Sequence, residues 1–386
     1  LYGWAFGHLM RDRPVVVIPD DHDVYQGNIW GQGGREASAP GFPDGGFRQH
    51  PDFVNAVMRT HADHFPDPHD PTPMLRGIDV FYTSMNYGRV SFAILADRYF
   101  KTGPAAVLPN DRGRPDHVYP EEAPEGWDPL TLDVPEAKLL GDRQLSFLRD
   151  WATDWEGADF KCALSQTIFA NLANYHGGGQ TYLVGDLDSN GWPQTGRNKA
   201  LHELRRGYAF MYAGDQHLAS IIHHGINQQR DSGWSFCVPS IAAGYPRSWL
   251  PDREGRPVAN RPDPDLPNTG DYREGLGNRV SVYAVGNPAS ENNNETPETL
   301  GHDKASGHGI VRFDSKDRTI DMECYRLLWD ANNPGDDDQF PGWPRTINIE
   351  ENYGRQAIAH LPEIKVTGMK NPVVQVIDET EGDVVY

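Results

Sequence analysis

A short apolar segment followed at once by four ionisable residues constrains the fold of this chain most. Residues 15–18 are Val-Val-Val-Ile, a run typical of a parallel strand that is buried on both faces. After one proline, the chain continues with Asp20, Asp21, His22 and Asp23. Open α/β sheets bind their ligands at the carboxyl ends of such strands. We therefore predict a buried strand at residues 15–18 with a polar ligand site directly after it.

The composition excludes several classes of protein. The 386 residues include 35 Lys and Arg against 55 Asp and Glu, a formal net charge of −20, which argues against a nucleic-acid partner. A hydrophobic fraction of 38% with ten Trp allows a large core. No apolar run approaches the ~18 residues of a transmembrane helix. Three cysteines, Cys162, Cys237 and Cys324, are too few for a disulfide framework or a thiolate zinc site. We expect an acidic globular protein without a transmembrane segment, and the oligomeric state stays open.

The periodicity of the apolar residues predicts both helices and strands. Helical spacing is found at residues 52–64, from Asp142 onward, and at residues 195–206. Short apolar or alternating runs predict seven further strands, at residues 78–85, 89–95, 161–164, 208–213, 279–285, 309–313 and 318–325. Buried strands alternate with helices in the first half, and antiparallel strands follow. This order predicts an α/β fold, a sandwich of two mixed sheets with outer helices.

Three features bear on domain organisation. Residues 31–75 are rich in Gly, Pro, His and Asp and too long for a simple connection, so we interpret them as an insert, either an active-site lid or a disordered segment. Short β-like segments predict the start of a small β domain at residues 339–386, after a main domain of residues 1–338. The chain begins with Leu1 and stops in the strand-like residues 382–386. We therefore expect a fragment that lacks the N-terminal part of its main domain, with any signal peptide outside it.

A second polar cluster follows the predicted strand at residues 208–213. Residues 214–217 are Gly-Asp-Gln-His: the glycine permits a sharp turn, and Asp215 and His217 would point the same way on an extended backbone. Carboxylates favour hard divalent metals and a neutral imidazole suits iron or zinc. Four adjacent ionisable groups, as at residues 20–23, are costly to bury unless a cation compensates them. The alternatives are an exposed acidic turn at residues 20–23 and an ordinary polar turn at residues 214–217.

Residues 185–193 (GDLDSNGWP) form a third polar block. Their D-x-D-x-N-G pattern looks like the start of a calcium loop, but residues 194–198 lack the acidic residue expected at the end of such a loop. A helix–loop–helix calcium site is therefore excluded. The block is either an Asx-rich turn or, in company with the other two clusters, a source of metal ligands at Asp188 and Asn190.

These three blocks, in this order, resemble the PhoD-like alkaline phosphatases of the calcineurin-like metallophosphatase superfamily. That family has a D-D-H-E strand end, a D-G-Y-P segment followed by Arg and a leucine-rich helix, and a G-D-V-H turn. The similar segments here are residues 20–23, residues 190–193 with Arg197 and Leu201, and residues 214–217. Residues 141–148 are also similar to the family's L-G-x-x-Q-x-x-W-L helix, and the resemblance spans about residues 1–285.

Several departures accompany the resemblance. Asp23 stands for the family's Glu, and Arg197 lies one position further from its proline than usual. Asn190 stands for the family's Asp, with Asp188 two residues earlier as a substitute. The first two metal-binding blocks of the superfamily would lie upstream of residues 20–23 and are absent from this sequence. In a fragment, roughly half of the metal ligands would lie outside it.

The resemblance implies a metallophosphatase-type αββα sandwich and a metal-dependent hydrolase of phosphoesters, a phosphomonoesterase or phosphodiesterase with a dinuclear centre and metal-bound hydroxide. The implied metals are iron and calcium, with zinc or manganese as alternatives, and the implied substrate is a small-molecule or lipid phosphoester. His22 would act on the leaving oxygen, and Arg197 would pair with a phosphate oxygen unless it forms a surface salt bridge. The implied metal ligands are Asp21, Asp188, Asn190, Asp215 and His217.

Two wider questions keep alternatives. The family is typically exported folded, so the resemblance implies a periplasmic or extracellular location reached through a twin-arginine signal, with a cytoplasmic enzyme as the alternative. A catalytically inactive carbohydrate- or surface-binding protein on the same fold is the second functional hypothesis. The aromatic fraction of 11%, the ten Trp and the long inserts suit such a protein. Metal content and turnover of a chromogenic phosphomonoester distinguish the two hypotheses.

The remaining histidines predict less. His61 and His64, three residues apart on a helix, could bind a metal but are more typical of a solvated helix face. His223 and His224 are expected to be structural. His176 precedes three glycines, and no helix start follows them, so a flexible loop is favoured over a phosphate cradle.

Overall fold

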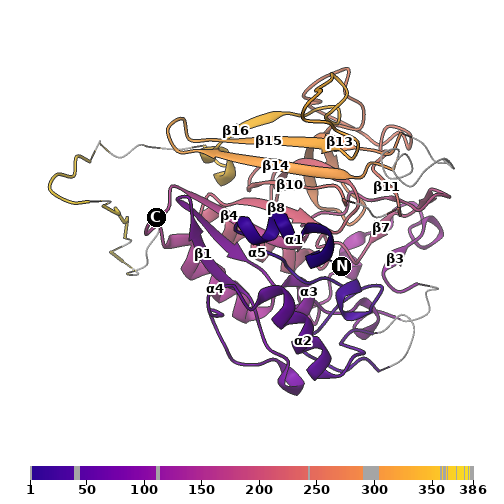
Figure 1. Cartoon of the computed structure of the whole chain (residues 1–386). Helices are drawn as coiled ribbons and strands as arrows, with labels where there is room; N and C mark the ends of the chain where they lie inside the picture. Colours follow the sequence, from indigo (N-terminus) through magenta and orange to yellow (C-terminus); the bar gives the residue numbers. More distant parts are fainter. Residues whose placement is uncertain are drawn as a thin grey trace.

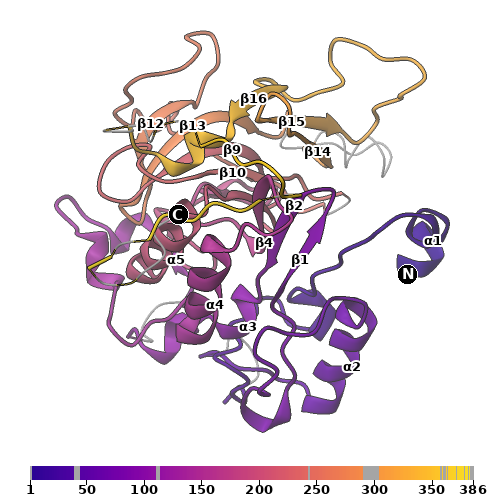
Figure 2. The same ribbon diagram turned by 90° about the vertical axis from the view of Figure 1, so that its left-hand side faces the viewer.

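An eight-stranded mixed sheet forms the centre of the computed structural model, which describes residues 2–38, 44–109, 114–241, 244–289, 304–356 and short stretches beyond (Figures 1 and 2). Strands β2, β4, β8 and β10 run parallel, and the other four strands pair antiparallel. In spatial order the strands are β1 (Thr83–Tyr87), β2 (Val90–Ile94), β4 (Phe160–Thr167), β8 (Phe210–Gly214), β10 (Trp234–Cys237), β9 (Ala219–Gly225), β13 (Arg279–Gly286) and β12 (Gly270–Arg273).

Different layers cover the two faces of this sheet (Figure 1). On one face, Phe147 of helix α4 (Gly141–Thr153) and Leu201 of helix α5 (Gln194–Arg206) share a core with Ala163 of β4. On the other face, Cys162 of β4 shares a core with Ile320 of a three-stranded antiparallel sheet. Successive residues of a strand point to opposite faces, so neighbours in β4 enter different cores. The small sheet consists of β14 (Gly307–Asp314), β15 (Thr319–Arg326) and β16 (Arg345–Asn348).

Short elements connect the main layers. Strand β3 pairs with β7, and β5 pairs with β6 and β11. No helix among the described residues is long and apolar enough to cross a membrane. The short strands are β3 (His117–Val118), β5 (Tyr175–His176), β6 (Thr181–Tyr182), β7 (Gly185–Asp186) and β11 (Arg247–Ser248). The other helices are α1 (Tyr2–Asp12), η1 (His22–Val24), α2 (Pro51–Ala62), η2 (Leu75–Gly77), α3 (Asp97–Phe100), η3 (Pro104–Ala106), η4 (Pro120–Glu122), η5 (Pro129–Leu132) and η6 (Ile349–Tyr353).

Most of the predicted elements are confirmed, with shifted ends. The predicted helices correspond to α2, α4 and α5, and the seven predicted strands correspond to β1, β2, β4, β8, β13, β14 and β15. The turn between β1 and β2 falls at Gly88 and Arg89, both with positive φ, as a two-residue hairpin requires. The mixed α/β class is therefore confirmed.

The predicted strand at residues 15–18 is wrong. This segment pairs with no strand, although Val16 and Ile18 pack against the same core as α2. Its backbone meets a helix instead of a sheet, since His64 Nε2 lies 2.6 Å from the carbonyl oxygen of Val15. An apolar run satisfies an extended segment lying on the core as well as it satisfies a strand, so the composition of the run could not separate the two.

The predicted insert at residues 31–75 is packed where the structure describes it. Phe47 and Val54 are fully buried, and Trp30 forms a β-bridge with Gly46. Residues 39–43 of the insert lie outside the described residues. The division into domains at residue 338 stays a prediction, and β16 pairs with β15 across it.

Gly275 offers a test of the packing beside β7. A Cβ at this position would lie 1.4 Å from the carbonyl oxygen of Val184, the residue before β7. We expect Gly275→Ala to lower the free energy of unfolding by at least about 2 kcal/mol, because backbone must move to make room. Gly179→Ala is the control, since nothing lies within 4 Å of the added methyl group. Equal midpoints for the two variants in chemical denaturation would contradict the packing.

Candidate active site

A fully buried arginine holds four carboxylates at one end of the large sheet. Arg98 Nε lies 3.1 Å from Asp20 Oδ1, and its Nη2 lies 3.1 Å from Asp188 Oδ1 and 3.4 Å from Asp21 Oδ2. Its Nη1 lies 3.2 Å from Asp215 Oδ2. We call these five residues, with Asp97, the Arg98 cluster. Its carboxylates come from parts of the chain that are distant in sequence.

The parallel strands explain why these residues meet. Arg98 follows β2, Thr167 ends β4 and Asp215 follows β8. The carboxyl ends of parallel strands lie at the same edge of a sheet, where α/β proteins bind their ligands. Thr167 links the other two residues, because its Oγ1 accepts from Arg98 Nη1 and donates to Asp215 Oδ2, both at 3.1 Å.

Asp97 fixes the backbone around the cluster. Its two carboxylate oxygens accept hydrogen bonds from the amides of Gln166 and Thr167, each at 3.2 Å. The side-chain amide nitrogen of Asn190 donates to Asp97 and to the carbonyl oxygen of Thr167. Asn190 therefore anchors its loop, and only its Oδ1, 3.4 Å from Lys101 Nζ, faces a cation.

Lys101 holds the loop that carries Asp188. Its buried ammonium group donates to the carbonyl oxygens of Asp188 and Ser189, both at 2.7 Å. Burial lowers the pKa of Lys101 to about 8, and Asp188 opposes this change. The Asp188 carboxylate also accepts from Trp30 Nε1 at 2.7 Å, so its orientation is fixed from three directions.

The cluster holds more negative than positive charge. Five carboxylates surround two cations, Arg98 and Lys101. Burial raises the pKa of Asp97 and raises the pKa of Asp21 to about 6, and neighbouring carboxylates add to the effect at Asp21. Burial also opposes ionisation of Asp215, but Arg98 brings the pKa of that group below its usual value. Oxygen donors with excess negative charge fit hard divalent cations, with the guanidinium of Arg98 among them.

The Asp215–His217 segment differs from the prediction. Asp215 and His217 have φ of 67° and 52°, both left-handed, so the two residues do not alternate on an extended backbone. The chain bends after β8 because it must leave the sheet at once, and non-glycine residues in this region cost free energy that functional sites often retain. His217 Nδ1 lies 2.8 Å from the carbonyl oxygen of Tyr245, which leaves Nε2 as the nitrogen that could bind a metal.

The first polar block lies at the rim of the cluster. His22 begins η1 and is exposed, and its amide donates to Asp21 Oδ1 at 2.7 Å. Asp23 turns away from Arg98: it accepts from the amide of Asp20 at 2.8 Å and lies 3.5 Å from His61 Nε2. His61 is therefore the ion-pair partner of Asp23 and not an open helix histidine.

The structure does not bring Arg197 to this cluster. The side chain is 1% exposed, so the alternative of a surface salt bridge is wrong. Its Nε donates to the carbonyl oxygen of Phe169 at 2.8 Å and its Nη1 to that of Gly225 at 3.0 Å. Burial lowers its pKa to about 10. Arg197 joins α5 to the interior of the sheet.

Comparison with known families identifies the chain. The sequence profile of the PhoD-like phosphatase family matches residues 5–273, which include all three polar blocks and Arg98. The chain belongs to the PhoD-like phosphatase family. No sequence among the curated proteins matches it. Among solved structures, it is similar to one titled "Structure of PhoD", with 16% sequence identity and a TM-score of 0.42 over 87% of this chain and 52% of that chain. The chain thus spans about half the length of that protein.

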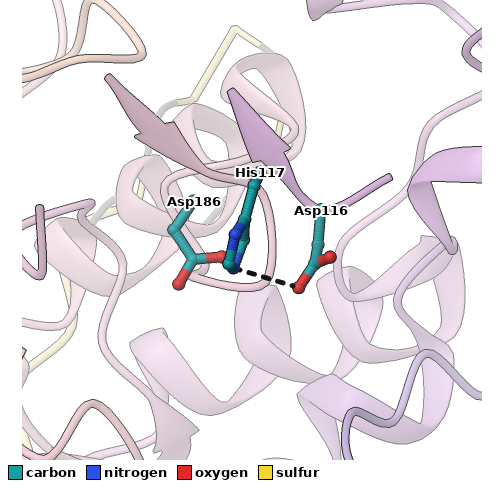
Figure 3. A group of neighbouring side chains, drawn as sticks. All are labelled: Asp116, His117 and Asp186. Carbon is teal, nitrogen blue, oxygen red and sulfur yellow. Dashed lines mark ion pairs between the residues drawn. The ribbon is translucent and has the colours of Figure 1, made fainter. Parts of the chain in front are cut away.

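The family resemblance predicted from the motifs is confirmed, but the sequence reasoning missed Asp97, Arg98, Thr167 and Lys101. The signal for Asp97 and Arg98 was present, since both follow the predicted strand at residues 89–95 just as residues 214–217 follow another. It also missed a group of buried ligands beside β7, namely Asp116, His117 and Asp186 (Figure 3). These three residues lie on two strands that pair only in the folded chain.

Asp21 gives the metal-free protein a pH-dependent stability. The pKa of Asp21 is raised from 3.8 to about 6, so the folded state binds this proton more tightly than the unfolded chain does. The resulting stabilisation is complete below the unfolded pKa and is lost as the pH rises through the folded one. Between about pH 5 and pH 7 we expect wild type to lose about 1 kcal/mol more unfolding free energy than Asp21→Asn. Urea titrations in chelator measure this difference, and parallel pH curves would refute it.

Removal of Arg98 tests the electrostatic role of that residue. Arg98→Met leaves buried carboxylates without their cation, and we expect the metal-free variant to lose about 3–5 kcal/mol of unfolding free energy. Arg312→Met is the matched control, because Arg312 forms an exposed ion pair with Glu323 and its loss should cost less than about 1 kcal/mol. Similar denaturation midpoints for the two variants would show that Arg98 does not hold the cluster.

Proposed function

We propose that this chain hydrolyses phosphoesters with metal ions bound at the Arg98 cluster. The observation that carries the proposal is the excess of carboxylate over cationic groups at the carboxyl ends of β2, β4 and β8. Such an excess is costly to bury unless further cations compensate it. The phosphatase family to which the chain belongs indicates which reaction these cations would serve.

The proposed ligands are Asp21, Asp188, Asp215 and His217. Bound metal ions, two in the proposed dinuclear centre, would supply hydroxide at neutral pH and polarise the phosphoryl group. Iron with calcium suits carboxylates accompanied by an imidazole, and zinc or manganese are the alternatives. Asn190 is a weaker candidate, because its amide nitrogen is already bonded to Asp97 and Thr167.

Other side chains would position these groups and act on the substrate. Arg98 and Trp30 keep the Asp188 carboxylate directed into the cluster. The contact between His217 Nδ1 and the Tyr245 carbonyl oxygen orients Nε2 for ligation. His22, exposed at the rim, would donate a hydrogen bond or a proton to the leaving oxygen. Arg197 has a structural role in this proposal.

The remaining proposals concern substrate, location and architecture. We propose a small-molecule or lipid phosphoester as substrate, either a monoester or a diester. Export to the periplasm or cell exterior is proposed from the family resemblance, with a cytoplasmic enzyme as the alternative, and cell fractionation distinguishes them. The shared core of the eight-stranded and three-stranded sheets supports the two-sheet metallophosphatase sandwich.

Two substitutions separate ligation from proton transfer. We expect Asp215→Asn to lose bound metal and hydrolysis of p-nitrophenyl phosphate together. His22→Ala should retain its metal and slow turnover by about 100-fold or more, because it removes a proton donor. Metal analysis and steady-state kinetics measure both effects.

The control is Asp336→Asn, an exposed carboxylate that should change neither property. Metal loss in His22→Ala as complete as in Asp215→Asn would refute the role given to His22. Wild-type protein that binds no metal and hydrolyses no phosphoester would favour the carbohydrate- or surface-binding hypothesis.

A further inference from the structure

A second group of potential metal ligands lies beside the Arg98 cluster. Strand β3 pairs with β7 so that His117 stands opposite Asp186, and Asp116 precedes His117 (Figure 3). One ligand atom from each of the three side chains lies within 4.8 Å of the others. All three residues are buried, at 1% exposure for Asp116 and Asp186 and 6% for His117. Burial of two carboxylates against an imidazole calls for an explanation.

Asp186 supplies an independent indication of a ligand. Its Oδ2 is buried and accepts no hydrogen bond from any residue that the structure describes. The nearest cationic groups to this oxygen are His176 Nε2 at 3.6 Å and Arg247 Nη1 at 3.9 Å, both too distant for a hydrogen bond. His176 Nε2 is instead 2.9 Å from the carbonyl oxygen of Ala173. A buried carboxylate oxygen without a partner is costly, and a bound cation would remove that cost.

Neighbouring groups hold the three ligands in position. His117 Nδ1 lies 3.2 Å from the hydroxyl of Tyr119, which leaves Nε2 directed toward the two carboxylates. Asp116 Oδ2 accepts from Asn28 Nδ2 at 2.7 Å, and Asp186 Oδ1 accepts from the amide of Asp188 at 3.0 Å. Metal ligands are commonly oriented by such outer hydrogen bonds.

We propose that Asp116, His117 and Asp186 bind one divalent transition-metal ion of the zinc type, at a site separate from the Arg98 cluster. Two carboxylate oxygens and one imidazole nitrogen are a donor set that zinc accepts, with water completing a tetrahedral site. The ion would join β3 to β7. Because Asp186 also holds the amide of Asp188, it would fix the start of the loop that enters the Arg98 cluster.

Two arginines next to the site offer the competing explanation. Arg114 Nε donates to Asp116 at 3.0 Å, and Arg247 lies near Asp186, so their charges could neutralise the carboxylates without a metal. Arg247, however, provides charge at 3.9 Å without a hydrogen bond. Direct measurement of bound zinc decides between the two explanations.

The experiment is a zinc titration of metal-stripped chain in which the Arg98 cluster has been disabled by Asp21→Asn and Asp215→Asn. We expect isothermal titration calorimetry to show one Zn²⁺ bound per chain in this background. Adding His117→Gln should abolish that binding. Adding His308→Gln should leave it unchanged, because His308 lies on β14 and not on β3 or β7.

Zinc binding that is absent from the background chain, or unaffected by His117→Gln, would overturn the proposal. Circular dichroism checks folding, and Asp116→Asn replaces His117→Gln under the same criteria if the latter does not fold. If the background chain does not fold, the wild-type chain is used, and His117→Gln must then reduce the bound zinc by one ion per chain. Since the readout is bound zinc and not hydrolysis, its outcome is independent of the proposed phosphoesterase activity.

Discussion

The contacts of the Arg98 guanidinium hold together the end of the sheet on which the candidate site depends. They join the segment before η1, the Asp188 loop and the bend after β8 to one side chain at the end of β2. Without a cation at this point the carboxylates would repel one another across a buried space. A buried ion cluster adds little net stability compared with apolar packing, but losing one member of it is costly. The relative positions of these segments are therefore coupled.

The order of the parallel strands brings this cation and its partners together. Helix α4 lies in the connection from β2 to β4, and α5 lies in the connection from β4 to β8, and both cover the same face of the sheet. Crossover connections of this kind return each strand to the same direction, so every strand ends at the same edge. The polar residues after β2, β4 and β8 thus meet although long helical segments separate them in sequence.

The same topology decides how much the sequence could predict. Residues 20–23 and 214–217 were found because ionisable groups follow an apolar run, but the run at residues 15–18 proved to be an unpaired segment on α2 and its core. Asp97 and Arg98 satisfied that rule and were overlooked, since acid and base together look like an ordinary ion pair. The partners of Asn190 and Arg197 are a distant carboxylate and distant carbonyl groups. No local pattern records such contacts.

The loop from Asp186 to Asn190 connects two buried groups with different donor chemistry. Asp188 belongs to the Arg98 cluster, where oxygen donors predominate, and Asp186 belongs to the group that contains His117. Oxygen-rich sites select hard cations, whereas an imidazole shifts preference toward zinc-type metals. The hydrogen bond from the Asp188 amide to Asp186 Oδ1 makes the geometry of one group depend on the other. A cation bound at either place would therefore restrict the loop that serves both, and Lys101, buried beneath Asp188 and Ser189, already restricts it from the opposite side.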